Sequence, residues 1–205
     1  MELNELKSYF LFDGEKYYPN QEFLSVLKKY IKNDKRVEHS LSVANLCFEV
    51  AKSNKLDNPF KYYFAGIVHD IGKGLTIDEL NFYIEYYFKE YMDLPPVAYH
   101  AFAGTIILSK EFLLMDEEIL DAIKFHCTGK AYMSTLAKIV YSCDKIDPLR
   151  GYNSSYMIDA MLREYKSGFK LVLKENKKYF EKKFPNNKEA YLNRLTKSCF
   201  DYYLD

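Results

Sequence analysis

Four histidines are the residues whose type and placement point most directly to chemistry. They are His39, His69, His100 and His126, and each lies in phase with the apolar residues of its own segment at helical spacing. A single inward histidine is most simply a core residue with a satisfied hydrogen bond. Four of four on apolar faces favour a shared site, because an apolar interior penalises an imidazolium and strands an unpaired ring nitrogen. Neutral imidazole is the commonest protein ligand of metal ions.

Two aspartates join the histidines. Asp70 directly follows His69, and Asp144 falls on the inward face of its own segment. A carboxylate on an apolar helix face needs a cation or strong donors to offset its desolvation. Four imidazoles and two carboxylates are about what two divalent ions need from a protein, and nitrogen and oxygen ligands without sulfur suit Fe, Mn, Co or Zn better than Ca. The set predicts two divalent metal ions that share a water and clamp a phosphoryl group.

Two basic residues lie close to these ligands in the sequence. Lys73 stands three residues after Asp70, so both rise from the same edge of a helix, where a lysine could reach a phosphate oxygen or help the leaving group. Arg36 stands three residues before His39 and could play the same role, although its position supports that role less strongly. An ordinary surface position is the competing interpretation for both residues.

The elements that must position these residues are helices. Gly and Pro together number only 14 in a chain that is 48% apolar, which favours long helices around a core. Capping residues and prolines mark the starts, and no segment alternates as a strand does. The expected helices cover about 21–32, 36–53, 59–72, 76–89, a stretch opening at 95–96, 116–126 and 134–147. The predicted fold class is all-α.

Three regions differ in character along the chain. Residues 1–20 read as an irregular or weakly extended leader, and 21–163 carry the helices with the candidate ligands. Residues 164–205 read as a basic helical extension that packs back on the domain, with Pro185-Asn186-Asn187 separating its last helix. From 161 to 205 there are 11 Lys+Arg against 6 Asp+Glu, which is most simply solvated surface, with nucleic-acid contact as the minority interpretation.

Charge and composition exclude several classes of protein. Lys+Arg and Asp+Glu both number 29, which argues against a dedicated DNA-coating protein. The uncharged stretch 94–109 contains two prolines and is shorter than the ~20 apolar residues of a membrane span. No secretory signal is visible at 1–7, and the four cysteines show no C-x-x-C spacing. We therefore expect a protein of the reducing cytoplasm with no membrane partner.

The order of these residues resembles the H…HD…D signature of the HD-domain phosphohydrolases. The fuller set closely resembles the YqeK family, the bacterial HD-domain symmetrical diadenosine tetraphosphatases, over roughly 21–163. The segments that carry the resemblance are 36–40 (RVEHS), 65–73 (AGIVHDIGK), His100, 126–129 (HCTG) and 143–150 (CDKIDPLR). The resemblance implies an all-α HD-domain helical bundle with a dinuclear centre that favours iron. It also implies hydrolysis of diadenosine tetraphosphate to two ADP by a hydroxide that the two metals activate.

The resemblance also assigns roles to single residues. One ion would be held by His39, His69, Asp70 and Asp144, with Asp70 bridging to a second ion held by His100 and His126. Lys73 would act near the phosphates as a catalytic residue beside Asp70. Substrate binding would fall to Arg36, Lys73, Thr128, Gly129, Lys145 and Arg150. The family commonly has Thr where Cys127 stands, Ala where Cys143 stands and Glu where Asp147 stands, and none of these departures removes a ligand.

Two other classes of function stay open at this point. A related HD-type enzyme could cleave a mononucleotide or a cyclic nucleotide instead, and product analysis separates these reactions. A helical RNA-binding or regulatory module with structural metals is the rival from a different class. Because degenerate members of such folds usually lose a ligand and all six stand here, catalysis is favoured. The expected partner is a nucleotide substrate, with nucleic acid disfavoured and homodimerisation open.

Overall fold

The computed structural model describes residues 3–183 and 193–204, and within them the chain is helical apart from one small hairpin. The strands are β1 (Phe10–Phe12) and β2 (Tyr17–Pro19), which pair antiparallel with Leu11 opposite Tyr18. The helices are α1 (Leu3–Leu6), α2 (Gln21–Ile31), α3 (Asp34–Ser53), α4 (Pro59–Val68), α5 (Ile77–Tyr87), α6 (Tyr99–Glu111), α7 (Glu117–Phe125), α8 (Thr135–Ile146), α9 (Ser155–Arg163), α10 (Tyr165–Lys183) and α12 (Arg194–Leu204). Single 3-10 turns cover 7–9, 89–91, 96–98 and 148–150. The all-α prediction is confirmed.

The helix starts follow side-chain caps that the sequence displays. Asn20 caps α2 and Ser134 caps α8, and each side chain accepts a hydrogen bond from the backbone N–H three residues later. At α5, Thr76 and Glu79 form the reciprocal capping box, in which each side chain accepts the other residue's backbone N–H. These caps explain why the starts were predictable to within a few residues.

Three of the candidate ligands lie just after the end of a helix. The helix expected over 59–72 ends at Val68, so His69 and Asp70 lie in the turn that follows α4. His126 likewise comes directly after the last residue of α7. Both histidines keep helical backbone dihedrals, so their side chains continue the inward face of the helix that precedes them.

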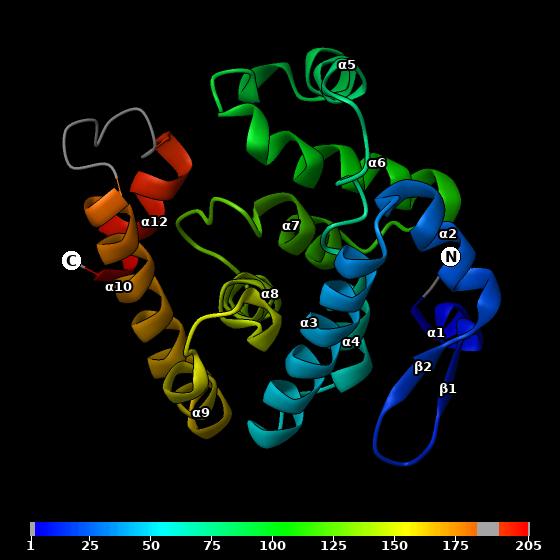
Figure 1. Ribbon diagram of the computed structural model, residues 1–205, viewed down its shortest axis with the longest axis horizontal. Coiled ribbons are helices and arrows are strands. Elements are labelled where there is room, and N and C mark those ends of the chain that lie inside the picture. Colours follow the sequence, from blue (N-terminus) through cyan, green and yellow to red (C-terminus); the bar gives the residue numbers. More distant parts are fainter. Residues whose placement is uncertain (1–2, 184–192, 205) are drawn as a thin grey trace.

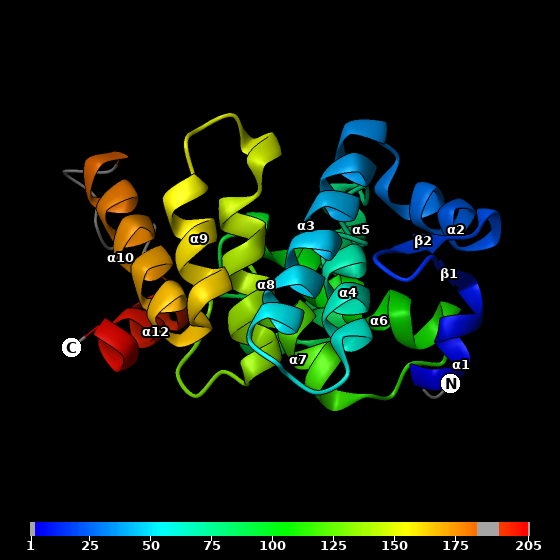
Figure 2. The same ribbon diagram turned by 90° about the horizontal axis from the view of Figure 1, so that it is seen from below.

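The helices pack around a central group formed by α3, α4, α7 and α8 (Figure 1). Helix α6 packs against α7 and α5, whereas α10 packs against α8 and α9 at the other side of the molecule. In both views the amino-terminal hairpin and the carboxy-terminal helices lie at opposite ends of the long axis (Figure 2). The centre of the bundle is therefore lined by helices that are far apart in sequence.

The leader is more ordered than the sequence indicates. The side chain of Phe10 on β1 packs among the aromatic rings of Phe23, Phe60 and Tyr63, with ring centroids 4.6, 5.3 and 5.7 Å away. Tyr63 donates a hydrogen bond to the carbonyl of Tyr17 at 2.9 Å. Burial of such rings is worth roughly 1.5–3 kcal/mol each, so the hairpin is fastened to α2 and α4.

The carboxy-terminal helices pack back on the body. Phe169, Val172 and Leu173 of α10 are buried, and the Thr196 hydroxyl of α12 donates to the Thr128 carbonyl at 3.0 Å. The expected break at Pro185-Asn186-Asn187 lies outside the described residues, and the domain limit at 163 stays a prediction. Among the described helices, none is long and apolar enough to cross a membrane.

Candidate metal centre

The six candidate ligands converge from five helices and the turns that follow them. The carboxylate atom Asp70 Oδ1 lies 3.0 Å from His100 Nε2, 3.4 Å from His126 Nε2 and 3.9 Å from His69 Nε2. The structure thus brings Asp70 to the middle of three imidazoles. All three of those side chains are almost fully buried.

A second cluster adjoins the first. Asp144 Oδ1 lies 3.2 Å from His39 Nε2 and 3.5 Å from His69 Nε2. The ligand atoms of His39, His69 and Asp144 all lie within 4.8 Å of one another, as do those of His69, Asp70 and His126. Two adjacent groups of three donors that share His69 could hold two neighbouring cations.

The protons of the imidazoles are positioned by hydrogen bonds outside the clusters. His69, His100 and His126 each place Nδ1 2.7–2.8 Å from the backbone carbonyl three residues earlier, which can only accept. His39 Nδ1 lies 2.5 Å from the Asp147 carboxylate. In the neutral imidazoles each Nδ1 therefore carries the proton, and each Nε2 presents a lone pair to the centre.

The inward-facing Nε2 atoms show whether metal ions fit this site. His100 Nε2 and His126 Nε2 lie only 3.3 Å apart, and two lone pairs at that separation repel unless a proton or a cation lies between them. His69 Nε2 is buried with no hydrogen-bond partner among the described residues. Divalent ions would coordinate all of these nitrogen atoms, so the donor set fits two divalent ions.

The charges of the centre favour bound cations. Burial alone would lower the pKa of His39, but Asp144 and Asp147 raise it to about 9. Burial would also lower the pKa of His126, which Cys127 and Asp70 raise to about 10. Although burial opposes it, the surrounding histidines, Lys145 and Arg150 hold the pKa of the Asp70 and Asp144 carboxyls well below the usual range. Metal ions compete with protons for such groups and replace them when bound.

Asp147 is a functional residue that sequence reasoning did not select. Its carboxylate is buried, accepts the Nδ1–H of His39 at 2.5 Å and accepts the hydroxyl of Ser42, also at 2.5 Å. It stands three residues after Asp144, at the end of α8, and this spacing was the one available signal. Asp147 fixes the tautomer and ring orientation of His39.

We expect Asp147→Ala to weaken binding of the metal ion held by His39 about 10- to 100-fold, because partners that orient a ligand contribute on that scale. Competition with a chromophoric chelator measures the affinity. Ser42→Ala is the matched control, since it removes the other contact of Asp147 and leaves the imidazole oriented. Equal affinities for Asp147→Ala and the wild type would contradict this role.

Two cations stand at the Asp70 side of the centre. Lys73 Nζ lies 3.9 Å from Asp70 Oδ1 and 3.3 Å from His100 Nε2. Arg36 Nη1 lies 4.0 Å from Asp70 Oδ2 and is half-exposed. Both basic residues therefore lie within reach of an anion bound at the centre.

Two further cations stand at the Asp144 side. Lys145 Nζ lies 2.9 Å from Asp144 Oδ2 and donates to the carbonyl of His126 at 3.0 Å. The guanidinium of Arg150 pairs with the Asp144 carboxylate and donates to its backbone carbonyl. Together with Arg36 and Lys73 these side chains line an open cleft of about 690 Å³ over the metal ligands.

The loop after His126 packs against helix α12. The Thr128 side chain is buried and donates to the Gly129 carbonyl at 3.0 Å. Gly129 has φ +66° and packs against Cys199 of α12, where a Cβ would meet that sulfur. Neither residue lines the cleft, so a substrate contact for them stays a prediction. In the structure they connect α7 to α12 through their packing contacts.

The fold and the site together define a helical metal-binding domain in which histidines and aspartates from separate helices meet at one cleft. The family model described as "HD domain" matches residues 36–149, more than half of the chain. The chain belongs to the HD domain family.

Individual relatives narrow the comparison. A protein of Bacillus subtilis named "Bis(5'-nucleosyl)-tetraphosphatase, symmetrical" is 27% identical over 175 residues, covering 80% of this chain and 93% of the relative. A protein of Mycoplasma genitalium named "Probable nicotinate-nucleotide adenylyltransferase/Ap4A hydrolase" is 31% identical over 165 residues, which are 79% of this chain. The chain spans 47% of that second relative, about half its length.

A solved structure has the same fold. It comes from Clostridium acetobutylicum and is described as a "predicted HD superfamily hydrolase involved in NAD metabolism". The likeness has a TM-score of 0.74 with 25% sequence identity and covers 89% of this chain and 95% of the other. The likeness thus extends beyond residues 36–149 to most of the helices described above.

Proposed function

We propose that the protein is a metal-dependent phosphohydrolase that cleaves diadenosine tetraphosphate symmetrically into two ADP. The observation that carries the proposal is the pair of adjacent donor clusters beneath a cleft lined by five basic side chains, Lys35, Arg36, Lys73, Lys145 and Arg150. A polyphosphate is the substrate class that such a cleft complements, because phosphate oxygens pair with lysine and arginine and with divalent ions. The names of the relatives from Bacillus subtilis and Mycoplasma genitalium support the particular substrate.

Divalent ions held by the six ligands would supply a water of lowered pKa and a Lewis acid toward phosphate oxygens. The protein's own residues do the positioning. Lys73 and Arg36 approach from the Asp70 side, whereas Lys145 and Arg150 approach from the Asp144 side, so a polyphosphate lying across the cleft meets cations along its length. These side chains offset the charge that develops as the central bridging oxygen leaves.

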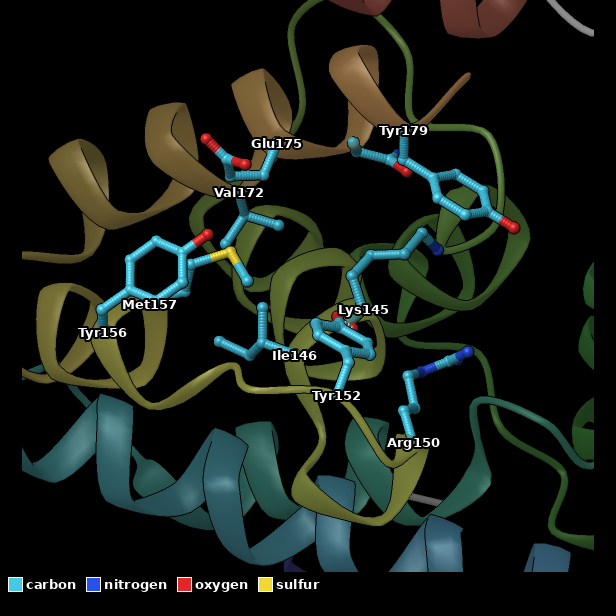
Figure 3. Close-up of a pocket in the computed structure, with 10 residues that line it drawn as sticks. Lys145, Ile146, Arg150, Tyr152, Tyr156, Met157, Val172, Glu175 and Tyr179 are labelled. Carbon is cyan, nitrogen blue, oxygen red and sulfur yellow. Dashed lines mark hydrogen bonds between the residues drawn. The ribbon is translucent and has the colours of Figure 1, made fainter. Parts of the chain in front are cut away.

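Symmetric cleavage requires that one nucleoside diphosphate half is gripped in a fixed place. A pocket of about 550 Å³ adjoins the cleft and shares Lys145, Arg150 and Tyr179 with it. It lies between α10 on one side and α8 with the start of α9 on the other (Figure 3). Its volume falls in the ~300–1,000 Å³ range of small-molecule sites.

The walls of this pocket suit a nucleoside. Tyr152, Tyr156 and Met157 offer aromatic and apolar surface, and Glu175 of α10 offers a carboxylate at the edge, as Figure 3 shows. A base is recognised by stacking on such rings and by hydrogen bonds at its edge. We infer that the base of one substrate half occupies this pocket while its phosphates extend past Lys145 to the metals.

Tyr179→Ala tests the nucleoside pocket. We expect KM for diadenosine tetraphosphate to rise roughly 5- to 100-fold with little change in kcat, because stacking of a base on an aromatic ring is worth ~1–3 kcal/mol. Tyr132→Ala is the matched control, since that ring is 78% exposed and lines neither the cleft nor the pocket. A steady-state assay giving the same KM for both variants would contradict the assignment.

The reaction itself is tested by product analysis. Protein loaded anaerobically with Fe(II) is incubated with diadenosine tetraphosphate, and the products are resolved by anion exchange. ADP alone is the expected result. ATP with AMP, or no turnover with any of Fe(II), Mn(II), Co(II) and Zn(II), would overturn the proposal. Iron is proposed as the resident metal, and elemental analysis of protein purified under anaerobic conditions checks it.

A further inference from the structure

The side chain of Cys127 lies inside the metal centre. Its sulfur atom is 3.3 Å from His126 Nε2 and 3.4 Å from His100 Nε2. The ligand atoms of these three residues all lie within 4.8 Å of one another. The other three cysteines are fully buried, whereas Cys127 lines the cleft. Its sulfur is thus placed among atoms that the metals are expected to bind.

The separations match those of donors on a single ion. Two nitrogens each ~2.0–2.1 Å from a tetrahedral metal are about 3.3 Å apart, and a nitrogen and a sulfur at ~2.3 Å are about 3.5 Å apart. Here the two Nε2 atoms are 3.3 Å apart, and Cys127 Sγ lies 3.3 and 3.4 Å from them. Asp70 Oδ1 lies 3.0 and 3.4 Å from the same nitrogens.

We propose that Cys127 is a protein ligand of the second metal ion, which is then held by His100, His126, Asp70 and the Cys127 sulfur. When the two imidazoles are neutral they donate from Nδ1 to backbone carbonyls, so their Nε2 atoms can only accept. One S–H can satisfy only one of these nitrogens, whereas an ion at the common position satisfies both together with the sulfur.

A sulfur ligand changes which metal the second position selects. Thiolate is a soft ligand and favours Zn(II), Co(II) or Fe(II) over Mn(II) and Mg(II), whereas the expectation from sequence was a set of nitrogen and oxygen ligands without sulfur. The bound thiolate also adds a negative charge to this ion and exposes the site to oxidation at sulfur. The inference rests on the metal centre and is independent of the nucleotide that is cleaved.

Cobalt substitution gives a readout that does not involve turnover. The protein is loaded with Co(II) and its absorption is recorded for the wild type, Cys127→Ser and the matched control Cys199→Ala. We expect a near-ultraviolet thiolate-to-cobalt charge-transfer band in the wild type and the control, and its loss in Cys127→Ser. Visible ligand-field bands that persist in Cys127→Ser show that the variant is folded and still binds cobalt. A band of equal intensity in Cys127→Ser would overturn the proposal.

Thiol alkylation provides the second measurement. With iodoacetamide and mass spectrometry of the native protein, we expect metal loading to slow modification of Cys127 at least ~10-fold relative to chelated protein, because a coordinated sulfur is not a free nucleophile. Equal rates with and without metal would contradict ligation. If the protein hydrolyses diadenosine tetraphosphate but shows no band, the ligand assignment fails alone, and a band without hydrolysis means that the proposed function fails alone.

Discussion

Replacing Asp70 by alanine should abolish hydrolysis and release both metal ions while the helical fold stays intact. Its carboxylate oxygen lies among the Nε2 atoms of three histidines, and one of these, His69, belongs to both donor clusters. Losing this carboxylate would remove a ligand and with it Lewis-acid stabilisation worth several kcal/mol, so the expected fall in kcat/KM is roughly 1,000-fold or more. Elemental analysis after gel filtration should find well under one ion per chain.

The control for this variant is Asp78→Ala, an exposed acid at the start of α5 that lies in neither cluster. Both variants should show the helical circular dichroism of the wild type, because Asp70 contributes its charge to the centre and little to the apolar core. Wild-type turnover by metal-replete Asp70→Ala would exclude the proposed chemistry. Loss of helical signal would show instead that Asp70 acts through folding.

The metal centre was predictable from sequence because its ligands carry a local signal. A histidine or aspartate in phase with apolar neighbours faces the core of a helical protein, wherever the helices finally pack. His39, His100 and Asp144 lie within helices, and their inward phase held in the structure. His69 and His126 follow their helices by one residue, yet they still point inward because the same turn continues past the last helical hydrogen bond.

Other parts of the centre depend on contacts that no local pattern displays. The bond of Asp147 to His39 joins residues 108 positions apart, and the closeness of Cys127 to His100 joins two helices that meet only in the folded chain. The sequence predicts an irregular or weakly extended leader but not its packing, because Phe10 and Tyr17 gain their order from rings on α2 and α4. Tertiary packing supplied the information in each case.

The surroundings of the Thr128 loop are a further feature that local sequence does not reveal. Its sequence and family resemblance favoured a nucleotide contact, but α12 packs over it, and the Thr196 hydroxyl donates to its carbonyl. The carboxy-terminal helices therefore change the surroundings of a loop that lies 68 residues earlier in the chain. The pocket beside the cleft also depends on α10, so the extension shapes the site as well as covering the body.

The glycine that follows the ligand pair His69-Asp70 should tolerate no side chain. A Cβ on Gly72 would lie closer than 3.0 Å to the backbone carbonyl oxygen of His100, and a second close contact would form with the backbone of Gly104. Neither atom can rotate away, so α6 would have to move and carry His100 with it. Overpacking of this kind costs about 3 kcal/mol or more, which lowers Tm by roughly 6–12 °C in a protein of this size.

Gly104→Ala is the matched control for Gly72→Ala, because it adds a methyl group to the same helix contact from the other side. There the nearest atom is the Ile71 side-chain methyl at 3.2 Å, which can give way, and alanine is the better helix former by about 1 kcal/mol. We expect Gly104→Ala to unfold near the wild-type temperature and Gly72→Ala to unfold well below it, both measured calorimetrically in chelator. Gly72→Ala should also lose the ion bound by His100, and equal stability of the two variants would show that the turn can yield.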